Sequence, residues 1–221
     1  DPNNQHHQIN NESDVLWQPS RMATLILTSG SSGLPKAAVH TFDAHFYSAE
    51  GVLSLMPFEK NERWLLSLPL FHVSGQGILW RWLLRGACIV VQENYSFVDA
   101  LQNCTHASLV PTQLWRFLQQ EEQQAMKLKS VLLGGAIIPS ELVNQAEKKG
   151  IHCWCGYGMT EMASTVCAKR ADNKVGVGLP LKGKQIRIVD DEIQIKSDSI
   201  ALGYWFNGEI KPLSLTIEGW Y

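Results

Sequence analysis

The chain has 221 residues, of which 45% are hydrophobic and 18% are charged, and this balance excludes collagen-like, disordered and disulfide-scaffold proteins. Its 19 Lys and Arg residues against 21 Asp and Glu give a formal net charge of −2, without a basic cluster, so we expect no nucleic-acid partner. No apolar run approaches the ~20 residues of a membrane span. Five cysteines without a recognisable secretion signal predict reduced thiols in the cytoplasm.

Short apolar runs alternate with amphipathic stretches through most of the chain. Residues 1–20 are rich in Asn, Gln and His, and predict a polar tail or a crossing segment. From residue 21 to 174 the alternation predicts an α/β core, with a layered and mostly parallel sheet flanked by helices. The expected strands are 22–27, 64–70, 87–91, 106–110, 130–135 and 151–158, and the expected helices are 43–56, 75–84, 112–120 and 139–150.

Residues 175–221 have a different texture, rich in short strands. The run 186–195, IRIVDDEIQI, predicts two strands around a turn at Asp190 and Asp191. We therefore expect a smaller β-rich subdomain to begin near residue 175.

A loop of glycines and hydroxyl residues, TSGSSGLPK, follows the first apolar strand and runs from Thr28 to Lys36. Small residues let backbone N–H groups approach phosphate oxygens, while hydroxyls and an ammonium add charge-assisted donors. The loop is not a Walker A motif, because Gly30 and Gly33 are too close together and Ala37 follows the lysine. On composition alone, a polar surface loop is an equal alternative.

The arrangement of this loop resembles the signature loop of the adenylate-forming enzymes, which include acyl- and aryl-CoA synthetases, nonribosomal-peptide adenylation domains and luciferases. Four further segments resemble motifs of that superfamily in the same order: LPLFHVSG at 68–75, LLGGA at 132–136, GYGMTE at 156–161 and ALGYW at 201–205. The resemblance implies the central part of the large N-terminal domain of such an enzyme. The chain ends at EGWY, before the family's ribose-binding Asp and its C-terminal domain with a catalytic lysine, so we expect these 221 residues alone to form no thioester.

The resemblance also implies a nucleotide site. Lys36, Thr160 and Glu161 would be catalytic: Lys36 would hold the β- and γ-phosphates of ATP, Thr160 would donate to the α-phosphate, and Glu161 would hold Mg²⁺. Without the resemblance, Thr160 and Glu161 also fit a helix N-cap with an acidic first turn. The implied ATP-binding residues are Thr28, Ser29, Gly30, Ser31, Ser32, Gly33, Lys36, Gly134, Gly135, Ala136, Gly156, Tyr157, Gly158 and Thr160.

The implied reaction activates a carboxylic acid with ATP and then transfers the acyl group to the thiol of coenzyme A. Segments 67–87, 105–115 and 155–169 are most similar to the aryl-CoA ligases of menaquinone biosynthesis, whose acid carries an aromatic ring, a ketone and two carboxylates. The implied acid-binding residues are His72, Ser74, Gln76, Arg81 and Thr165. For Arg81, in an apolar helix, the alternatives are a snorkelling side chain or a structural ion pair.

Two other functions stay open at this point. One is a different adenylate-forming enzyme, which activates a fatty acid or an amino acid; the other is a non-catalytic ATP-binding fragment. An acidic side chain in the pocket would indicate an amino-acid substrate, and none is found in the pocket segments. The family further implies a possible homodimer.

Overall fold

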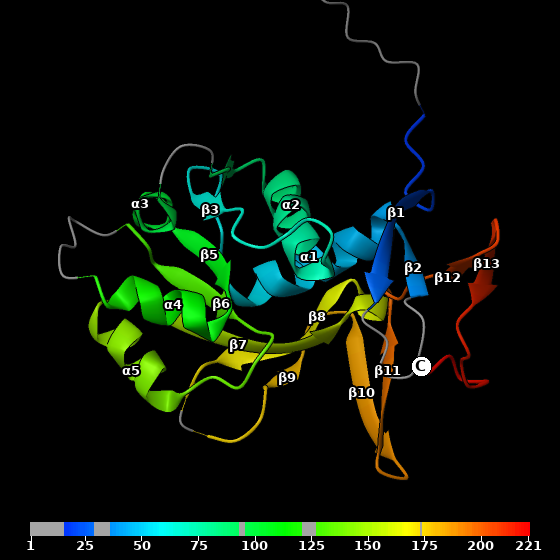
Figure 1. Cartoon of the computed structure of the whole chain (residues 1–221). Coiled ribbons are helices and arrows are strands. Elements are labelled where there is room, and N and C mark those ends of the chain that lie inside the picture. The colour runs from blue at the N-terminus through cyan, green and yellow to red at the C-terminus, as the bar shows by residue number, and fades with distance from the viewer. Residues whose placement is uncertain (1–15, 29–35, 93–95, 121–126, 173) are drawn as a thin grey trace, which may run out of the picture.

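The computed structural model describes residues 16–28, 36–92, 96–120, 127–172 and 174–221, and its largest sheet is the expected parallel one (Figure 1). This sheet has seven strands in the order β4-β3-β5-β6-β7-β8-β9. The first five are parallel and the last two join antiparallel. The strands are β3 (Arg63–Leu65), β4 (Cys88–Val90), β5 (His106–Leu109), β6 (Ser130–Leu133), β7 (His152–Met159), β8 (Ser164–Arg170) and β9 (Leu179–Pro180).

Helices cover both faces of this sheet, which confirms the layered α/β fold. Helices α4 and α5 lie on one face, and α1 and α2 on the other (Figure 1). Each face has its own buried cluster: Leu114 and Val143 belong to the first, and Val52 and Ile78 to the second. The helices are α1 (Phe42–Leu55), α2 (Val73–Arg85), α3 (Phe97–Gln102), α4 (Pro111–Leu118) and α5 (Ser140–Lys148), with a 3₁₀ turn, η1 (Thr160–Met162).

A second, antiparallel sheet has the order β1-β2-β12-β13. Its strands are β1 (Met22–Thr28), β2 (Lys36–Thr41), β12 (Gly203–Phe206) and β13 (Glu209–Pro212). Strand β12 pairs with β2, so that Gly203 faces Val39. The sheet thus combines strands from both sides of the expected boundary near residue 175, which stays a prediction.

The hairpin of β10 (Lys184–Val189) and β11 (Glu192–Ser197) projects from the body of the molecule (Figure 1). Its turn places Asp190 at φ 50° and Asp191 at φ 64°. Two consecutive left-handed residues form the hairpin turn whose twist matches that of the strands. The two strands expected around this Asp pair are therefore confirmed.

The cysteines are all free, and Cys153 and Cys155 alternate with Trp154 along β7, as expected for a strand. The expected tail, 1–20, falls mostly outside the described residues, but Trp17 packs on Phe42 with ring centroids 4.8 Å apart. Within the part of the chain that the structure describes, no helix is both long and apolar enough to cross a membrane.

Candidate functional site

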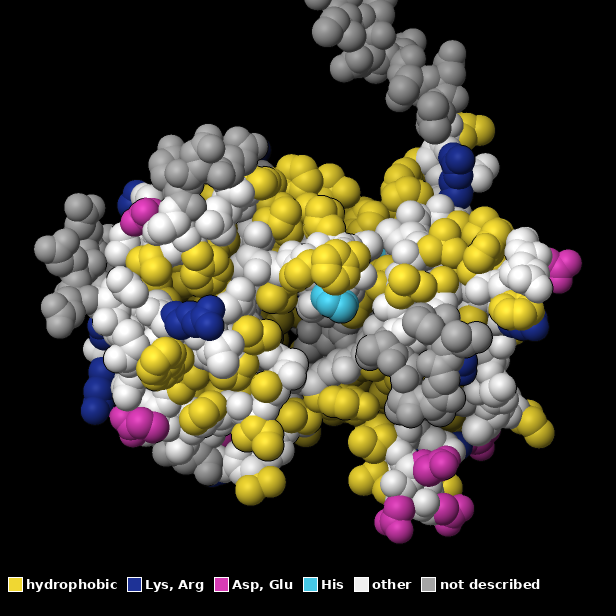
Figure 2. All heavy atoms as spheres, in the orientation of Figure 1, with side chains coloured by type: hydrophobic (Ala, Val, Ile, Leu, Met, Phe, Trp, Pro, Cys, Tyr) yellow, Lys and Arg dark blue, Asp and Glu magenta, His cyan; other side chains and the backbone are white. Residues whose placement is uncertain are grey.

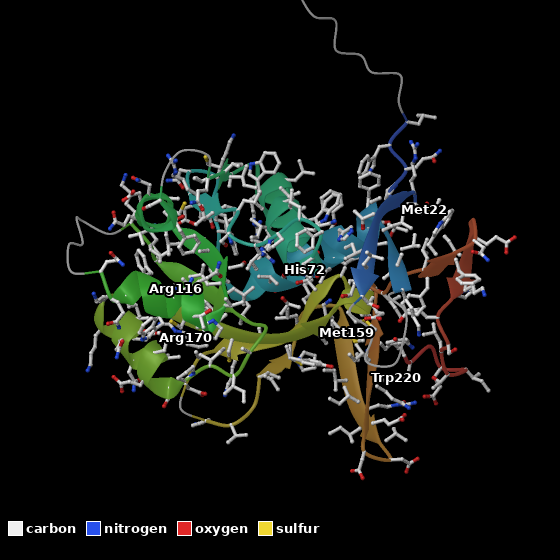
Figure 3. The ribbon with its side chains drawn as sticks, in the orientation of Figure 1. Met22, His72, Arg116, Met159, Arg170 and Trp220 are labelled. Atoms are coloured by element: carbon white, nitrogen blue, oxygen red, sulfur yellow. The ribbon has the colours of Figure 1, made fainter. Side chains whose placement is uncertain are left out.

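A cavity of about 270 Å³ opens where β5 and β6 end, beside the last residues of β7. Open parallel sheets bind their ligands at this edge, outside the carboxyl ends of the strands. The side of the molecule drawn in Figure 2 is hollowed near its middle, and Figure 3 labels His72 and Met159 in that region. Nine of the expected site residues line the cavity: Ser74, Arg81, Gly134, Gly135, Gly156, Tyr157, Gly158, Thr160 and Thr165. The nucleotide and acid residues implied by the resemblance therefore meet in one place.

The wall formed by the GYG segment needs glycine for reasons of space. A Cβ on Gly158 would lie 2.0 Å from the carbonyl oxygen of Ser164, and one on Gly156 would lie 3.1 Å from Cγ2 of Thr165. The backbones of β7 and β8 thus approach too closely at Gly158 for any side chain. This close approach places the backbone of the motif directly at the cavity.

Arg81 reaches the cavity from α2 and is only 2% exposed. Its Nη2 donates to the Ser108 hydroxyl over 3.1 Å, and its guanidinium carbon lies 4.5 Å from the ring centroid of Trp64. Its Nε has no partner, and among the described residues no carboxylate lies within ion-pair distance. Burial lowers the pKa of this guanidinium to about 9. Arg81 is therefore neither a snorkelling side chain nor part of a described ion pair.

Ser108 is a site residue that the sequence analysis missed. It is the second-last residue of β5, is buried, and lines the cavity beside Arg81. Its carbonyl oxygen accepts a hydrogen bond from the Ser67 hydroxyl, which anchors the strand end. The available signal was a hydroxyl residue near the carboxyl end of a buried strand, where ligands bind.

Thr160 and Glu161 form the first two residues of η1, immediately after β7. The residue at the N-cap position is Met159, which makes no side-chain capping bond, so Thr160 does not serve as the cap. Thr160 lines the cavity, whereas Glu161 is 8% exposed and lies behind the lining. Oε1 of Glu161 accepts a hydrogen bond from the Tyr204 hydroxyl over 2.6 Å.

The backbone after this motif is strained and firmly held. Ala163 has φ 52° and Ser164 has φ 106°, backbone angles that residues other than glycine rarely adopt. The carbonyl oxygens of Glu161, Met162 and Ala163 each accept a hydrogen bond, the first two from the loop between β11 and β12 and the third from α1. Ala201 N–H donates to Glu161 over 2.7 Å, the Ser199 hydroxyl to Met162 over 2.9 Å, and the Ser48 hydroxyl to Ala163 over 2.6 Å. Strain of this kind persists where surrounding contacts over-determine the conformation, as they do here.

A buried lysine reinforces the same turn. Nζ of Lys184 donates to the Met162 carbonyl over 3.3 Å and also to the Ser199 hydroxyl. Burial lowers the pKa of this ammonium to about 8. The β10–β11 hairpin is thereby fixed to the Thr160–Glu161 motif.

The ends of the expected phosphate loop lie side by side, because Thr28 and Lys36 are paired residues of β1 and β2. Thr28 is buried, and the exposed ammonium of Lys36 lies 5.0 Å from the ring centroid of Tyr204. Five expected loop residues lie outside the described residues: Ser29, Gly30, Ser31, Ser32 and Gly33.

Besides Thr28, Lys36 and Glu161, three further expected residues among those described do not line the cavity. His72 is exposed at the N-cap of α2, Gln76 donates through Nε2 to the Leu70 carbonyl over 3.0 Å, and Ala136 is exposed. Their roles stay predictions.

The carboxylate of Glu161 is suited to a hard divalent cation. The described residues contain no group of three or more His, Cys, Asp or Glu side chains, so a cage made wholly of such protein ligands is absent from them. Mg²⁺ commonly takes one or two carboxylates and completes its coordination with phosphate oxygens and water. A lone Glu161 next to Thr160 fits that mode of binding.

Comparison with known proteins finds relatives along most of the chain. A family model described as AMP-binding enzyme matches residues 1–205. A 2-succinylbenzoate–CoA ligase of Salmonella typhimurium is 60% identical over 207 residues, which make up 94% of this chain and 45% of that enzyme. The Escherichia coli ligase of the same name is 58% identical, and the match covers the same 94% of this chain and 45% of that enzyme. The chain thus spans about half the length of these relatives.

Solved structures agree in fold. An arginine-to-lysine variant of E. coli MenE with bound OSB-AMS has a TM-score of 0.87 at 56% identity, over 94% of this chain and 46% of that one. MenE from Bacillus subtilis, solved with ATP and a magnesium ion, has a TM-score of 0.77 at 29% identity, and the match covers 92% of this chain and 50% of that one. The α/β fold with its added antiparallel sheets is therefore that of a known group of enzymes.

Proposed function

Because the chain belongs to the AMP-binding enzyme family, we propose that it carries the acid- and nucleotide-binding part of an ATP-dependent 2-succinylbenzoate–CoA ligase of menaquinone biosynthesis. The observation that carries the choice of acid is the buried, unpaired guanidinium of Arg81 at the cavity. An isolated buried charge is costly, and an anionic ligand relieves that cost. A substrate with two carboxylates supplies one for Arg81 and leaves the other to react.

The cavity suits the rest of this acid. Leu68 and Leu132 offer apolar contacts for an aromatic ring, and Ser74 and Thr165 offer hydroxyls for the ketone. Within the described lining there is no Asp or Glu to hold an α-ammonium group, which argues against an amino-acid substrate. A plain fatty acid would leave the Arg81 guanidinium without an anion.

In the proposed first step, an oxygen of the free carboxylate attacks the α-phosphorus of ATP. The bond from that phosphorus to the bridging oxygen breaks, and pyrophosphate leaves with the electron pair. Thr160 donates a hydrogen bond to the α-phosphate, and Lys36 compensates charge on the β- and γ-phosphates. Mg²⁺ held by Glu161 would supply charge neutralisation of the phosphates.

In the second step the sulfur of coenzyme A attacks the acyl carbon of the adenylate, so that the thioester forms and AMP leaves. Arg81 and Ser108 keep the second carboxylate fixed throughout, which orients the reacting end. We further propose the cytoplasm as the compartment, since all five cysteines are free, and a homodimer as the family implies.

The test is acid-dependent ATP–pyrophosphate exchange by the full-length gene product with 2-succinylbenzoate, benzoate, hexanoate and phenylalanine. We expect exchange with 2-succinylbenzoate far above the other three acids. Preferential exchange with another acid would be compatible with the nucleotide site but would overturn the proposed substrate. The absence of exchange with all four acids would overturn the proposed ligase activity.

A further inference from the structure

Tyr204 connects the two halves of the proposed nucleotide site. It lies on β12 and pairs with Ala38 of β2, the strand that follows the expected phosphate loop. Its ring lies under the Lys36 ammonium, 5.0 Å from centroid to Nζ, and its hydroxyl donates to Glu161 over 2.6 Å. One side chain thus contacts a predicted phosphate ligand and the predicted metal ligand.

The bond to Glu161 has a defined direction. A carboxylate only accepts, so the Tyr204 hydroxyl must donate, and its oxygen is then free to accept from the Tyr221 hydroxyl 3.1 Å away. The phenol oxygen thus has both roles filled, as donor to Glu161 and as acceptor from Tyr221.

The other contacts of this turn act on the backbone. The carbonyl oxygens of Glu161, Met162 and Ala163 are fixed by Ala201, by Ser199 with Lys184, and by Ser48. Those bonds hold the backbone around Glu161 and do not engage its carboxylate. The Tyr204 hydroxyl acts on the carboxylate itself.

We infer that Tyr204 is a positioning residue that orients the Glu161 carboxylate toward a divalent cation bound with ATP. Carboxylates that bind metals are themselves held by outer hydrogen bonds, and loss of such a partner typically costs 10–100-fold in metal affinity. This inference rests on the proposed function, because it takes Glu161 as the metal ligand.

The test uses the Tyr204→Phe variant of the full-length gene product, because phenylalanine keeps the ring under Lys36 and removes only the hydroxyl. Mn²⁺ binding in the presence of ATP is measured by electron paramagnetic resonance. We expect Mn²⁺ affinity to fall roughly 10–100-fold in the variant. Tyr47→Phe, an exposed change on α1, serves as the matched control and should bind Mn²⁺ like the wild type.

A double-mutant cycle with Glu161→Gln separates this role from general damage. In that background Tyr204→Phe should cost nothing further, because the carboxylate it orients is gone. Tyr221→Phe leaves the Tyr204 donor in place, so its effect on Mn²⁺ affinity should be much smaller. Equal Mn²⁺ affinity in wild type and Tyr204→Phe would overturn the inference, as would the same loss with and without Glu161.

If Tyr204→Phe does not fold, 3-fluorotyrosine placed at position 204 tests the same contact by ¹⁹F nuclear magnetic resonance. Mn²⁺ bound with ATP should broaden this resonance strongly, because Glu161 would hold the ion close to the ring, and an unbroadened resonance would overturn the inference. The two failures are distinguishable: a wrong substrate would show as another acid preference in wild-type exchange, whereas a wrong role for Tyr204 would show as equal Mn²⁺ affinity in wild type and variant.

Discussion

The Arg81 guanidinium donates to the Ser108 hydroxyl over 3.1 Å and lies 4.5 Å from the Trp64 ring centroid, without an acidic partner among the described residues. A neutral hydroxyl and an aromatic face orient the group but do not neutralise it. Under the proposed function, the second carboxylate of the acid neutralises this charge. The first prediction tests this arrangement.

Arg81→Ala in the full-length gene product should raise KM for 2-succinylbenzoate roughly 10–100-fold, because one charge-assisted hydrogen bond to the second carboxylate is lost. The KM for benzoate, which lacks that carboxylate, should change little. Steady-state exchange kinetics with both acids measure the difference. Arg85→Ala, an exposed position at the end of the same helix, is the matched control, and equal effects of Arg81→Ala on both acids would remove the carboxylate role.

Lys36→Ala should slow ATP–pyrophosphate exchange by about two orders of magnitude, because an ammonium that stabilises phosphate charge is removed. The free energy of unfolding should stay within about 0.5 kcal/mol of wild type, since Lys36 is exposed. Urea denaturation and exchange assays measure the two quantities. Lys60→Ala, in an exposed turn, is the control, and an unchanged kcat for Lys36→Ala would refute its assignment.

Two glycines at the cavity make a matched pair for stability. Gly158→Ala should destabilise the fold by about 1–3 kcal/mol, because the new Cβ would meet the Ser164 carbonyl oxygen at 2.0 Å. Gly134→Ala should be nearly neutral, since its nearest neighbour, the Gly156 carbonyl oxygen, is 3.9 Å away. The urea denaturation midpoints of the two variants measure this difference in stability. Equal midpoints for the two variants would show that the backbones of β7 and β8 can separate freely at Gly158.

Two buried histidines predict loss of stability in mild acid. Burial lowers the pKa of His40 from 6.5 to about 4 and that of His45 to about 3. Below pH 6.5 the unfolded chain takes up protons that the folded chain excludes, so the free energy of unfolding falls as pH drops toward 4. Each histidine contributes a slope of about 1.4 kcal/mol per pH unit in that window.

The check is urea denaturation between pH 7 and pH 4.5 for wild type and His45→Phe. Phenylalanine preserves the ring stacked on Trp80 at 4.6 Å but gives up the 2.7 Å hydrogen bond to Thr24. The variant should lose about one proton from the pH slope of the free energy of unfolding. An unchanged slope in His45→Phe would contradict the assignment.

Local signals in the sequence predicted much of this molecule. Helix α5 was expected from Pro139 at its start and Gly150 beyond its end, and it spans Ser140–Lys148 with Gly150 at φ 78°. The Asp190–Asp191 hairpin was equally local. In both cases a few adjacent residues decide the backbone geometry, so no distant partner is needed.

Features that depend on distant residues could not be predicted in this way. The first strand was expected, but it pairs with β2 in a separate sheet, and that sheet is extended by β12, far along the chain. Ser108 was missed because its role appears only when α2 brings Arg81 beside β5. Tyr204 was noted within a motif, yet its bond to Glu161 spans 43 positions of sequence.

The pairing of β2 with β12 has a consequence for synthesis of the protein. Strand β2 lies between β1 and β12, so one of its edges stays open until residues 203–206 have left the ribosome. Non-local pairing of this kind delays folding, and an open strand edge can pair with other chains meanwhile. Strand β2 thus gains its second neighbour only after β12 has been made, and a nascent chain stalled before residue 203 would leave that edge open to pairing with other chains.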